Sequence, residues 1–144
     1  MKKISNTFIK SNSTSPKQDL IELWRRIVFS MAVSNIDDHL CNHGFLLTEY
    51  GWTLSPMYDV NPNTYGNTLS LNVNTDDNSI RFDLAIETAE YFSIDIHKAR
   101  STVADIKKTI QMNWRALAAD YGLSRDAVNR MEPAFANRPP GAPC

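Results

Sequence analysis

The pattern of apolar and polar positions begins with a strong helical signal. Ser15 followed by Pro16 is typical of a helix start, because a proline at the first helical position needs no backbone N–H partner. The apolar residues that follow recur at helical spacing and predict a helix from Pro16 to about Ser34 with one buried face. That face consists of Leu20, Leu23, Trp24, Ile27, Val28, Met31 and Ala32.

A short extended region comes next. The runs GFLLT (44–48) and WTLS (52–55) are separated by the turn-like residues EYG and predict a β-hairpin. Because a hairpin returns the chain to its starting point, Asn42 before it and Asp59 after it are expected to lie close together in space. A turn-rich segment then surrounds LSLNV (69–73), which is predicted to be a further strand.

The remainder of the chain is helical by pattern. A short helix is predicted over 83–92 and a long one over 95–121, with Gly122 placed to end it. Ser124 is expected to cap a last helix that ends near Phe135. The apolar stripe of the long helix consists of Ala99, Val103, Ile106, Ile110, Trp114, Leu117 and Ala118.

Aromatic and basic residues add two expectations. Trp24, Trp52 and Trp114 stand at helical or strand spacing and are interpreted as core residues. Arg25 and Arg26 are expected to flank the first helix in solvent.

Length and composition favour one domain. The chain has 144 residues, of which 42% are hydrophobic, as is ordinary for a globular domain. Residues 1–14 are polar with little periodicity and are expected to be a flexible lead-in, residues 15–136 to form the domain, and residues 137–144 a disordered tail. The predicted fold class is mainly α, a helical body that carries a small β-hairpin.

Charge, hydropathy and cysteine content exclude several classes of protein. A formal net charge of −1 gives no broad basic surface for nucleic acid or acidic membranes, and no apolar run approaches the roughly 18 residues of a membrane span. Cys41 and Cys144 build no disulfide framework, and no signal-peptide pattern opens the chain, so a cytoplasmic location is expected. The five glycines fit neither GxGxxG nor GxxxxGK[ST], so the chain lacks a glycine-rich phosphate loop.

The most polar stretch, SNIDDHLCNH (34–43), directly follows the first helix. Asp37 and Asn42 are five positions apart, and Asp59 lies beyond the hairpin. Protein kinases use this order: an Asp that orients the acceptor hydroxyl, an Asn five positions later that binds magnesium, and a second Asp at the next loop. Oxygen ligands suit magnesium. The spacing therefore predicts a phosphoryl-transfer site.

Two simpler interpretations remain open for these residues. Asp37, Asp38 and Asn42 have the side chains of a helix-ending turn, in which Asx groups bond to local backbone. A metal-dependent nuclease, with a histidine that activates water, is disfavoured because no basic residues near the cluster would hold a phosphodiester.

A zinc site is the remaining alternative. His39, Cys41 and His43 alternate in HLCNH, but ligands at such spacing rarely converge on one tetrahedral ion. A zinc site also needs a distant second pair, and only His97 is left to contribute. The pattern therefore disfavours zinc.

Two segments carry a family resemblance. NIDDHLCNHGFLL (35–47) and GWTLSPMYDVNP (51–62) together resemble the signature of the C-terminal part of HipA-like serine/threonine kinases, the toxins of type II toxin-antitoxin modules. The resemblance continues more weakly through NTLSLNV and DLAIETAEYF and covers roughly Leu20 to Phe135. It implies a helical, kinase-like C-lobe in which the hairpin carries the catalytic and metal-binding loops.

The resemblance also implies roles for individual residues. Asp37 becomes the catalytic aspartate, and His39 belongs to the same motif, where its expected role is to fix the loop by hydrogen bonding. Asn42 and Asp59 become ligands of Mg²⁺ and, through it, of ATP. The implied substrate is a protein hydroxyl, and the implied partner is a DNA-binding, HipB-like antitoxin.

The sequence departs from the family pattern in two ways. Cys41 stands where the family often has Lys or Arg, which removes a cation near the phosphate or the acceptor. The family's N-terminal lobe, with its nucleotide-pairing lysine, has no counterpart here, as in a truncated gene, a split kinase or a fragment. The chain is therefore expected either to need a separate N-terminal lobe or to be a non-catalytic protein-interaction module.

Overall fold

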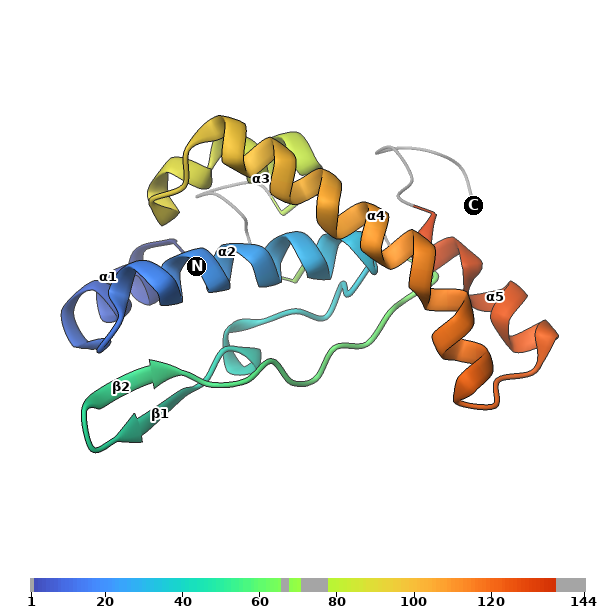
Figure 1. The fold of residues 1–144 in the computed structure, drawn as a ribbon, viewed down its shortest axis with the longest axis horizontal. Coiled ribbons are helices and arrows are strands. Elements are labelled where there is room, and N and C mark those ends of the chain that lie inside the picture. Colours follow the sequence, from blue (N-terminus) through green and yellow to red (C-terminus); the bar gives the residue numbers. More distant parts are fainter. Residues whose placement is uncertain (1, 66–67, 71–77, 137–144) are drawn as a thin grey trace.

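Two long helices dominate the structure, a computed structural model. It describes residues 2–65, 68–70 and 78–136. Helix α2 (Pro16–Ala32) lies in the middle of the molecule, and α4 (Ile96–Asp120) runs obliquely past it (Figure 1). Both helices match their predicted positions to within two residues at either end.

The hairpin lies on the side of α2 opposite to α4 (Figure 1). Strand β1 (Phe45–Thr48) pairs antiparallel with β2 (Gly51–Leu54), with Phe45 opposite Leu54. Gly51, expected in the turn, instead begins β2 with a φ of 120°, which favours glycine. The other described elements are α1 (Lys2–Asn12), the 3-10 turn η1 (Leu40–Asn42), α3 (Phe82–Glu87), the 3-10 turn η2 (Ala89–Phe92) and α5 (Arg125–Phe135). The described chain is thus mainly helical with one hairpin, as predicted.

The predicted apolar face of α2 forms the core. All of its seven residues are buried, and the largest, Trp24, also donates its indole Nε1–H to the Ala85 carbonyl, 2.9 Å away. Burial of a large apolar side chain contributes about 1.5–3 kcal/mol. This face therefore supplies much of the stability that holds α2 against its neighbours.

The first turn of α2 is fixed by a neighbouring serine rather than by Ser15. Ser15 has no side-chain capping bond; its backbone N–H donates to Ser13 Oγ, which in turn donates to Asp19 Oδ2 at 2.7 Å. Asp19 Oδ2 also accepts the Leu54 N–H at 3.1 Å. The buried Asp19 carboxylate thereby ties the start of α2 to the end of β2.

The prediction of a flexible lead-in over residues 1–14 was wrong. Most of this segment forms α1, in which Ile9 is completely buried and belongs to the main core. The Phe8 ring lies 4.8 Å from the Phe45 ring, centroid to centroid. Ile9 and Phe8 hold this helix against the surface that α2 and the hairpin provide.

The C-terminal helices follow the sequence signals closely. Helix α4 ends at a Schellman motif, in which Gly122 adopts a φ of 77° and Leu123 N–H donates to the Ala118 carbonyl. Ser124 Oγ caps α5 by accepting the Ala127 N–H.

The remaining predictions for this part of the chain have mixed outcomes. The helix predicted over 83–92 is interrupted at Thr88, where α3 gives way to the turn η2. The strand predicted over 69–73 lies mostly outside the described residues, and an isolated bridge joins Thr68, directly before it, to Ser79. The predicted tail, 137–144, also lies outside them.

Two predictions about side chains need correction. Arg26 was expected in solvent, but only 6% of it is exposed, and its Nη2 donates to the Ser55 carbonyl at 2.7 Å. It is buried because it faces the segment that leaves β2. Trp52, expected in the core, is 36% exposed at the edge of the hairpin. Trp114 is buried as predicted and stacks on Phe135.

Among the described residues, no helix is both long and apolar enough to cross a membrane.

Candidate active site

Two segments that leave the main elements run side by side below α2 (Figure 1). Residues 34–43 lead from α2 to the hairpin, and residues 55–63 lead away from it; together they are called the loop junction here. A backbone hydrogen bond joins them at one end, where Asn63 N–H donates to the Ser34 carbonyl. The hairpin therefore does what its sequence predicted and folds the second polar segment back onto the first.

The contact between Asn42 and Asp59 is the main feature of the loop junction. Asn42 Nδ2 donates to Asp59 Oδ2 at 2.7 Å, across 17 positions of sequence. The prediction that these residues lie together is confirmed. Asn42 is buried, whereas Asp59 is exposed and has a φ of 55°, a left-handed conformation that is uncommon outside glycine but that Asp adopts more readily than most residues.

The second oxygen of the Asp59 carboxylate is held by another asparagine. Asn61 Nδ2 donates to Asp59 Oδ1 at 2.8 Å, and Asn61 N–H donates to Asn35 Oδ1 at 3.2 Å. Asn35 is 1% exposed, and its own N–H donates to the Ser30 carbonyl in α2. A chain of hydrogen bonds thus runs from α2 through Asn35 and Asn61 to Oδ1 of the Asp59 carboxylate.

Sequence reasoning assigned no role to Asn35 or Asn61. The available signal was their position: Asn35 begins the polar stretch that contains Asp37, and Asn61 follows Asp59 by two residues. A turn-rich segment contains many such residues, so the signal did not single them out.

Asp37 stands apart from this network. Its side chain is exposed and makes no hydrogen bond or ion pair within the described part of the chain, so the structure does not join it to Asn42 or Asp59. Its loop is anchored next to it, where the Ile36 carbonyl accepts the Ser70 N–H at 2.7 Å. The carboxylate therefore faces solvent from a tethered backbone.

His39 contributes to the loop through its backbone. Its N–H donates to Asn42 Oδ1 at 3.3 Å, and its carbonyl accepts the Asn42 N–H at 2.9 Å. Its ring Nδ1 is buried and has no hydrogen-bond partner among the described residues. The loop is therefore fixed at His39, but not by the imidazole.

Asp38 and His43, which had no predicted role, form a buried pair. His43 Nε2 lies 3.0 Å from Asp38 Oδ1, and each side chain is 4% exposed. The atoms are at ion-pair distance but are not aligned as a hydrogen bond, and His43 Nδ1 has no partner in the described chain. Buried acidic groups need such a partner because isolation from water is costly.

Tyr58 and Gly44 pack where the two segments meet the hairpin. The Tyr58 hydroxyl donates to the Cys41 carbonyl, and a Cβ on Gly44 would lie 3.1 Å from Tyr58 Oη and 3.3 Å from Ser55 Oγ. Gly44 therefore lets the tyrosine reach the loop. The Cys41 thiol itself is exposed and unbridged.

Carboxylate and amide oxygens are ligands that suit a hard cation such as Mg²⁺. Asn42, however, turns Nδ2 toward Asp59 and Oδ1 toward the His39 N–H, so both residues offer oxygens to one ion only after the Asn42 amide turns over. Each Asp59 oxygen accepts one side-chain hydrogen bond, and Asn42 Oδ1 accepts one, which leaves lone pairs on all three. In the described residues, no three His, Cys, Asp or Glu side chains gather as a self-sufficient metal centre.

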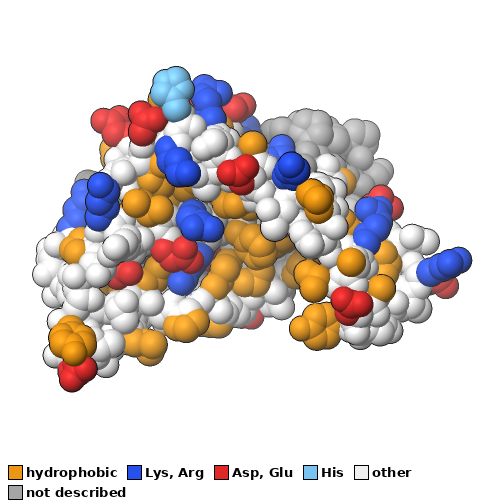
Figure 2. Space-filling model, viewed as in Figure 1, with side chains coloured by type: hydrophobic (Ala, Val, Ile, Leu, Met, Phe, Trp, Pro, Cys, Tyr) orange, Lys and Arg blue, Asp and Glu red, His pale blue; other side chains and the backbone are white. Residues whose placement is uncertain are grey.

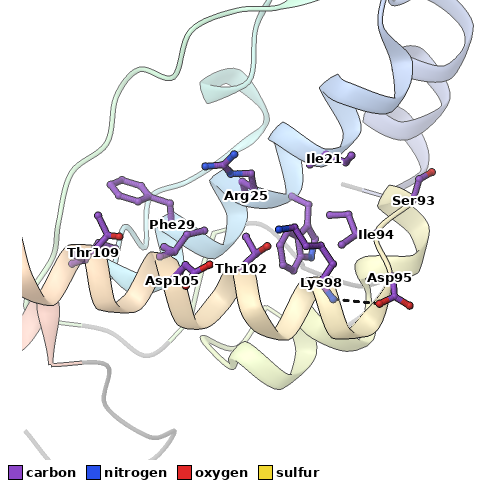
Figure 3. Close-up of a pocket in the computed structure, with 13 residues that line it drawn as sticks. Ile21, Arg25, Phe29, Ser93, Ile94, Asp95, Lys98, Thr102, Asp105 and Thr109 are labelled. Carbon is purple, nitrogen blue, oxygen red and sulfur yellow. Dashed lines mark hydrogen bonds between the residues drawn. The ribbon is translucent and has the colours of Figure 1, made fainter.

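One hollow of about 490 Å³ meets the loop junction at Val60 and Pro62, and others lie away from it. One of these others, of about 570 Å³, lies between α2 and α4, and Figure 3 shows Arg25 and Phe29 from α2 facing Lys98 and Asp105 from α4 across it. Figure 2 shows the apolar side chains gathered on this face between charged ones. Asp95 lies at one end of this hollow and caps α4. The backbone N–H groups of Lys98 and His97 donate to its carboxylate and lower its pKa. No residue of the loop junction lines this hollow.

Comparison with known proteins supports the resemblance seen in the sequence. A model of the HipA-like C-terminal domain matches residues 1–114, which include α1, both segments of the loop junction and most of α4. The match starts earlier than Leu20 and stops before α5, so its limits differ from the predicted ones. No curated protein and no solved structure matches. Since the match covers well over half of the chain, this protein belongs to the HipA-like C-terminal domain family, a family of kinase domains.

Proposed function

We propose that this chain is the catalytic C-lobe of a HipA-like serine/threonine protein kinase. It would transfer the γ-phosphoryl group of Mg-ATP to a protein hydroxyl. The observation that carries the proposal is the 2.7 Å contact between Asn42 and Asp59, which brings the two polar motifs of a kinase family to one place. An isolated turn at the end of α2 would not require Asp59.

The proposed roles follow from burial and contacts. Asp37 acts as the catalytic base, since its exposed carboxylate on a tethered loop is accessible to a hydroxyl group of a protein substrate. Asn42 and Asp59 hold Mg²⁺ through their oxygens, and Asn61 orients the Asp59 carboxylate. His39 supports Asn42 through its backbone. When bound, Mg-ATP would supply the phosphoryl group and the charge that neutralises its transfer.

Two partners complete the proposal. Kinases also need a lobe that clamps the nucleotide phosphates, and we propose that an N-terminal lobe does so here, in this polypeptide or another. A HipB-like antitoxin is the proposed regulator. Both come from the family resemblance.

Calorimetry with Mg-ATP tests the metal role of Asp59. Asp59→Asn keeps the size of the side chain but removes its charge, and we expect magnesium-dependent ATP affinity to fall roughly tenfold or more, as when metal sites lose supporting groups. Asp83→Asn is the matched control, because Asp83 is an exposed aspartate on α3 outside the loop junction. Equal affinity of wild type and Asp59→Asn would show that Asp59 is not a ligand.

The hairpin supports a second candidate, a non-catalytic interaction module. Leu47 and Tyr50 are 68% and 80% exposed at its tip, and exposed apolar groups of this kind often mark a contact with a partner. Under this alternative, Asp37→Ala would preserve partner binding, and Leu47→Asp would abolish it. If the chain has a measurable effect on cells, loss of that effect in a folded Asp37→Ala variant would count against this alternative.

A further inference from the structure

Asp38 and His43 lie one residue away from the two ends of the proposed kinase motif. Asp38 follows Asp37, and His43 follows Asn42. The buried pair is therefore separated by five positions, as are the proposed base and metal ligand, and is shifted from them by one residue. We propose that this pair is a positioning device that fixes Asn42 relative to Asp37 and thereby sets the affinity of the site for a divalent cation. The inference rests on the proposed function.

The covalent chain transmits the constraint. Consecutive Cα atoms are 3.8 Å apart, so a fixed distance between Asp38 and His43 leaves Asp37 and Asn42 little freedom relative to each other. The short turn η1 lies between the paired residues. Loss of the pair would let the ends of this loop separate.

Among the described residues, this pair is the buried side-chain contact that joins the two ends of the loop. A 3-10 turn of three residues is weak, and the Asp37 side chain has no partner in the described chain. Two bonds between His39 and Asn42, of 2.9 and 3.3 Å, lie within the loop, and the bonds from Tyr58 to Cys41 and from Asn42 to Asp59 hold its second half to the neighbouring segment. The Asp38–His43 pair is the buried contact that closes the loop.

The effect reaches the metal ligands through Asn42. Asn42 Nδ2 holds Asp59 Oδ2, and Asp59 keeps a left-handed backbone that its contacts must maintain. A displaced Asn42 would therefore disturb both proposed ligands together. The expected consequence is weaker cation binding in a chain that is still folded.

Asp19 offers a matched control for stability. It is also a buried carboxylate, and it accepts bonds from Ser13 Oγ and Leu54 N–H, but it bonds neither Asn42 nor Asp59. Asp19→Asn and Asp38→Asn make the same chemical change in buried positions. Only the second should alter the cation site.

Manganese titration followed by NMR tests the proposal, with Mn²⁺ as a paramagnetic probe for a hard-cation site. In the wild-type chain, Mn²⁺ is expected to broaden the amide signals of Asn42 and Asp59 first. Asp38→Asn and His43→Gln should weaken this effect roughly tenfold or more. Asp38→Glu, which keeps a carboxylate, should recover part of the affinity, and Asp19→Asn should keep all of it.

The outcomes separate this inference from the proposed function. If Mn²⁺ affinity in Asp38→Asn and His43→Gln equals that of wild type, the positioning role is wrong while the ligand assignment stands. If Mn²⁺ does not broaden Asn42 and Asp59 in the wild-type chain, the ligand assignment fails and the inference falls with it. If Asp19→Asn loses as much affinity as Asp38→Asn, the effect is general destabilisation, and the positioning role is again wrong. His43→Gln decides the matter should Asp38→Asn not fold.

Discussion

Helix α2 and the loop junction beside it bury side chains of opposite character. The helix buries apolar residues such as Leu23 and Trp24, whereas the junction buries Asn35, Asp38 and Asn42. Apolar burial is non-directional and tolerates small shifts, but a buried polar group is stable only with a partner at the right distance and angle. The helix therefore contributes stability, and the junction fixes the positions of its polar side chains. The predictions below test that division through the free energy of unfolding, from the largest change to the smallest.

Trp24→Ala should cause the largest loss. It removes a buried indole and its bond to the Ala85 carbonyl, and aromatic truncations of this kind cost about 3–5 kcal/mol. Urea unfolding measures the change. Trp52→Ala, at the exposed edge of the hairpin, should cost clearly less; similar losses for both would mean that the core is not centred on α2.

Asn35→Ala should destabilise less but disturb the junction more. The part-buried Asn61 N–H would lose its acceptor, and loss of one hydrogen bond of this kind costs about 0.5–1.5 kcal/mol. The NMR signals of Asn61 and Asp59 should shift along with the change in urea midpoint. Asn113→Ala, on the exposed face of α4, is the control, and unchanged Asn61 and Asp59 signals in Asn35→Ala would refute the anchoring role.

Gly44→Ala tests the packing where the junction meets the hairpin. The new methyl group would crowd Tyr58 Oη and Ser55 Oγ, and we expect a loss of about 1 kcal/mol. The double variant with Tyr58→Phe, which removes the hydroxyl, should be more stable than the sum of the single changes predicts. Simple additivity in this double-mutant cycle would exclude the contact.

Asp37→Asn should hardly change stability. Its side chain is exposed and without a partner in the described chain, so the free energy of unfolding should stay within about 0.5 kcal/mol of wild type. Under the proposed function, phosphoryl transfer by the chain together with an N-terminal lobe should nevertheless fall by roughly 10²- to 10⁴-fold. Phosphate transfer from labelled ATP measures this, and retained activity would reject Asp37 as the base.

The same division explains how much of the fold was predictable. Helix α2 was predicted nearly to its ends because seven apolar positions repeat at one period, and α4 because Gly122 marks its end. Helix α1 was missed because its sequence holds few apolar residues, and the surface that orders it comes from α2 and the hairpin. The residue pattern of α1 alone therefore does not indicate the surface on which the helix packs.

The candidate site was predictable only where a covalent constraint linked its parts. The hairpin forces residues before and after it together, so the contact between Asn42 and Asp59 followed from the sequence. The Asp38–His43 pair and the bond from Asn61 to Asp59 depend on the path of the loops and on side-chain direction, which no periodicity encodes. Burial of Arg26 was missed for the same reason.

The hydrogen bond of the Ser34 hydroxyl determines how far toward the C-terminus the folded lobe must extend. Ser34 opens the polar stretch, and its Oγ donates at 2.8 Å to the Ala134 carbonyl in α5, one hundred positions away. The family match stops at Trp114, inside α4, yet Trp114 stacks on Phe135. A protein shortened to the matched residues would expose that indole and leave Ser34 without its acceptor. Helix α5 therefore supports the start of residues 34–43, the first segment of the loop junction. A minimal version of this lobe must reach at least residue 135.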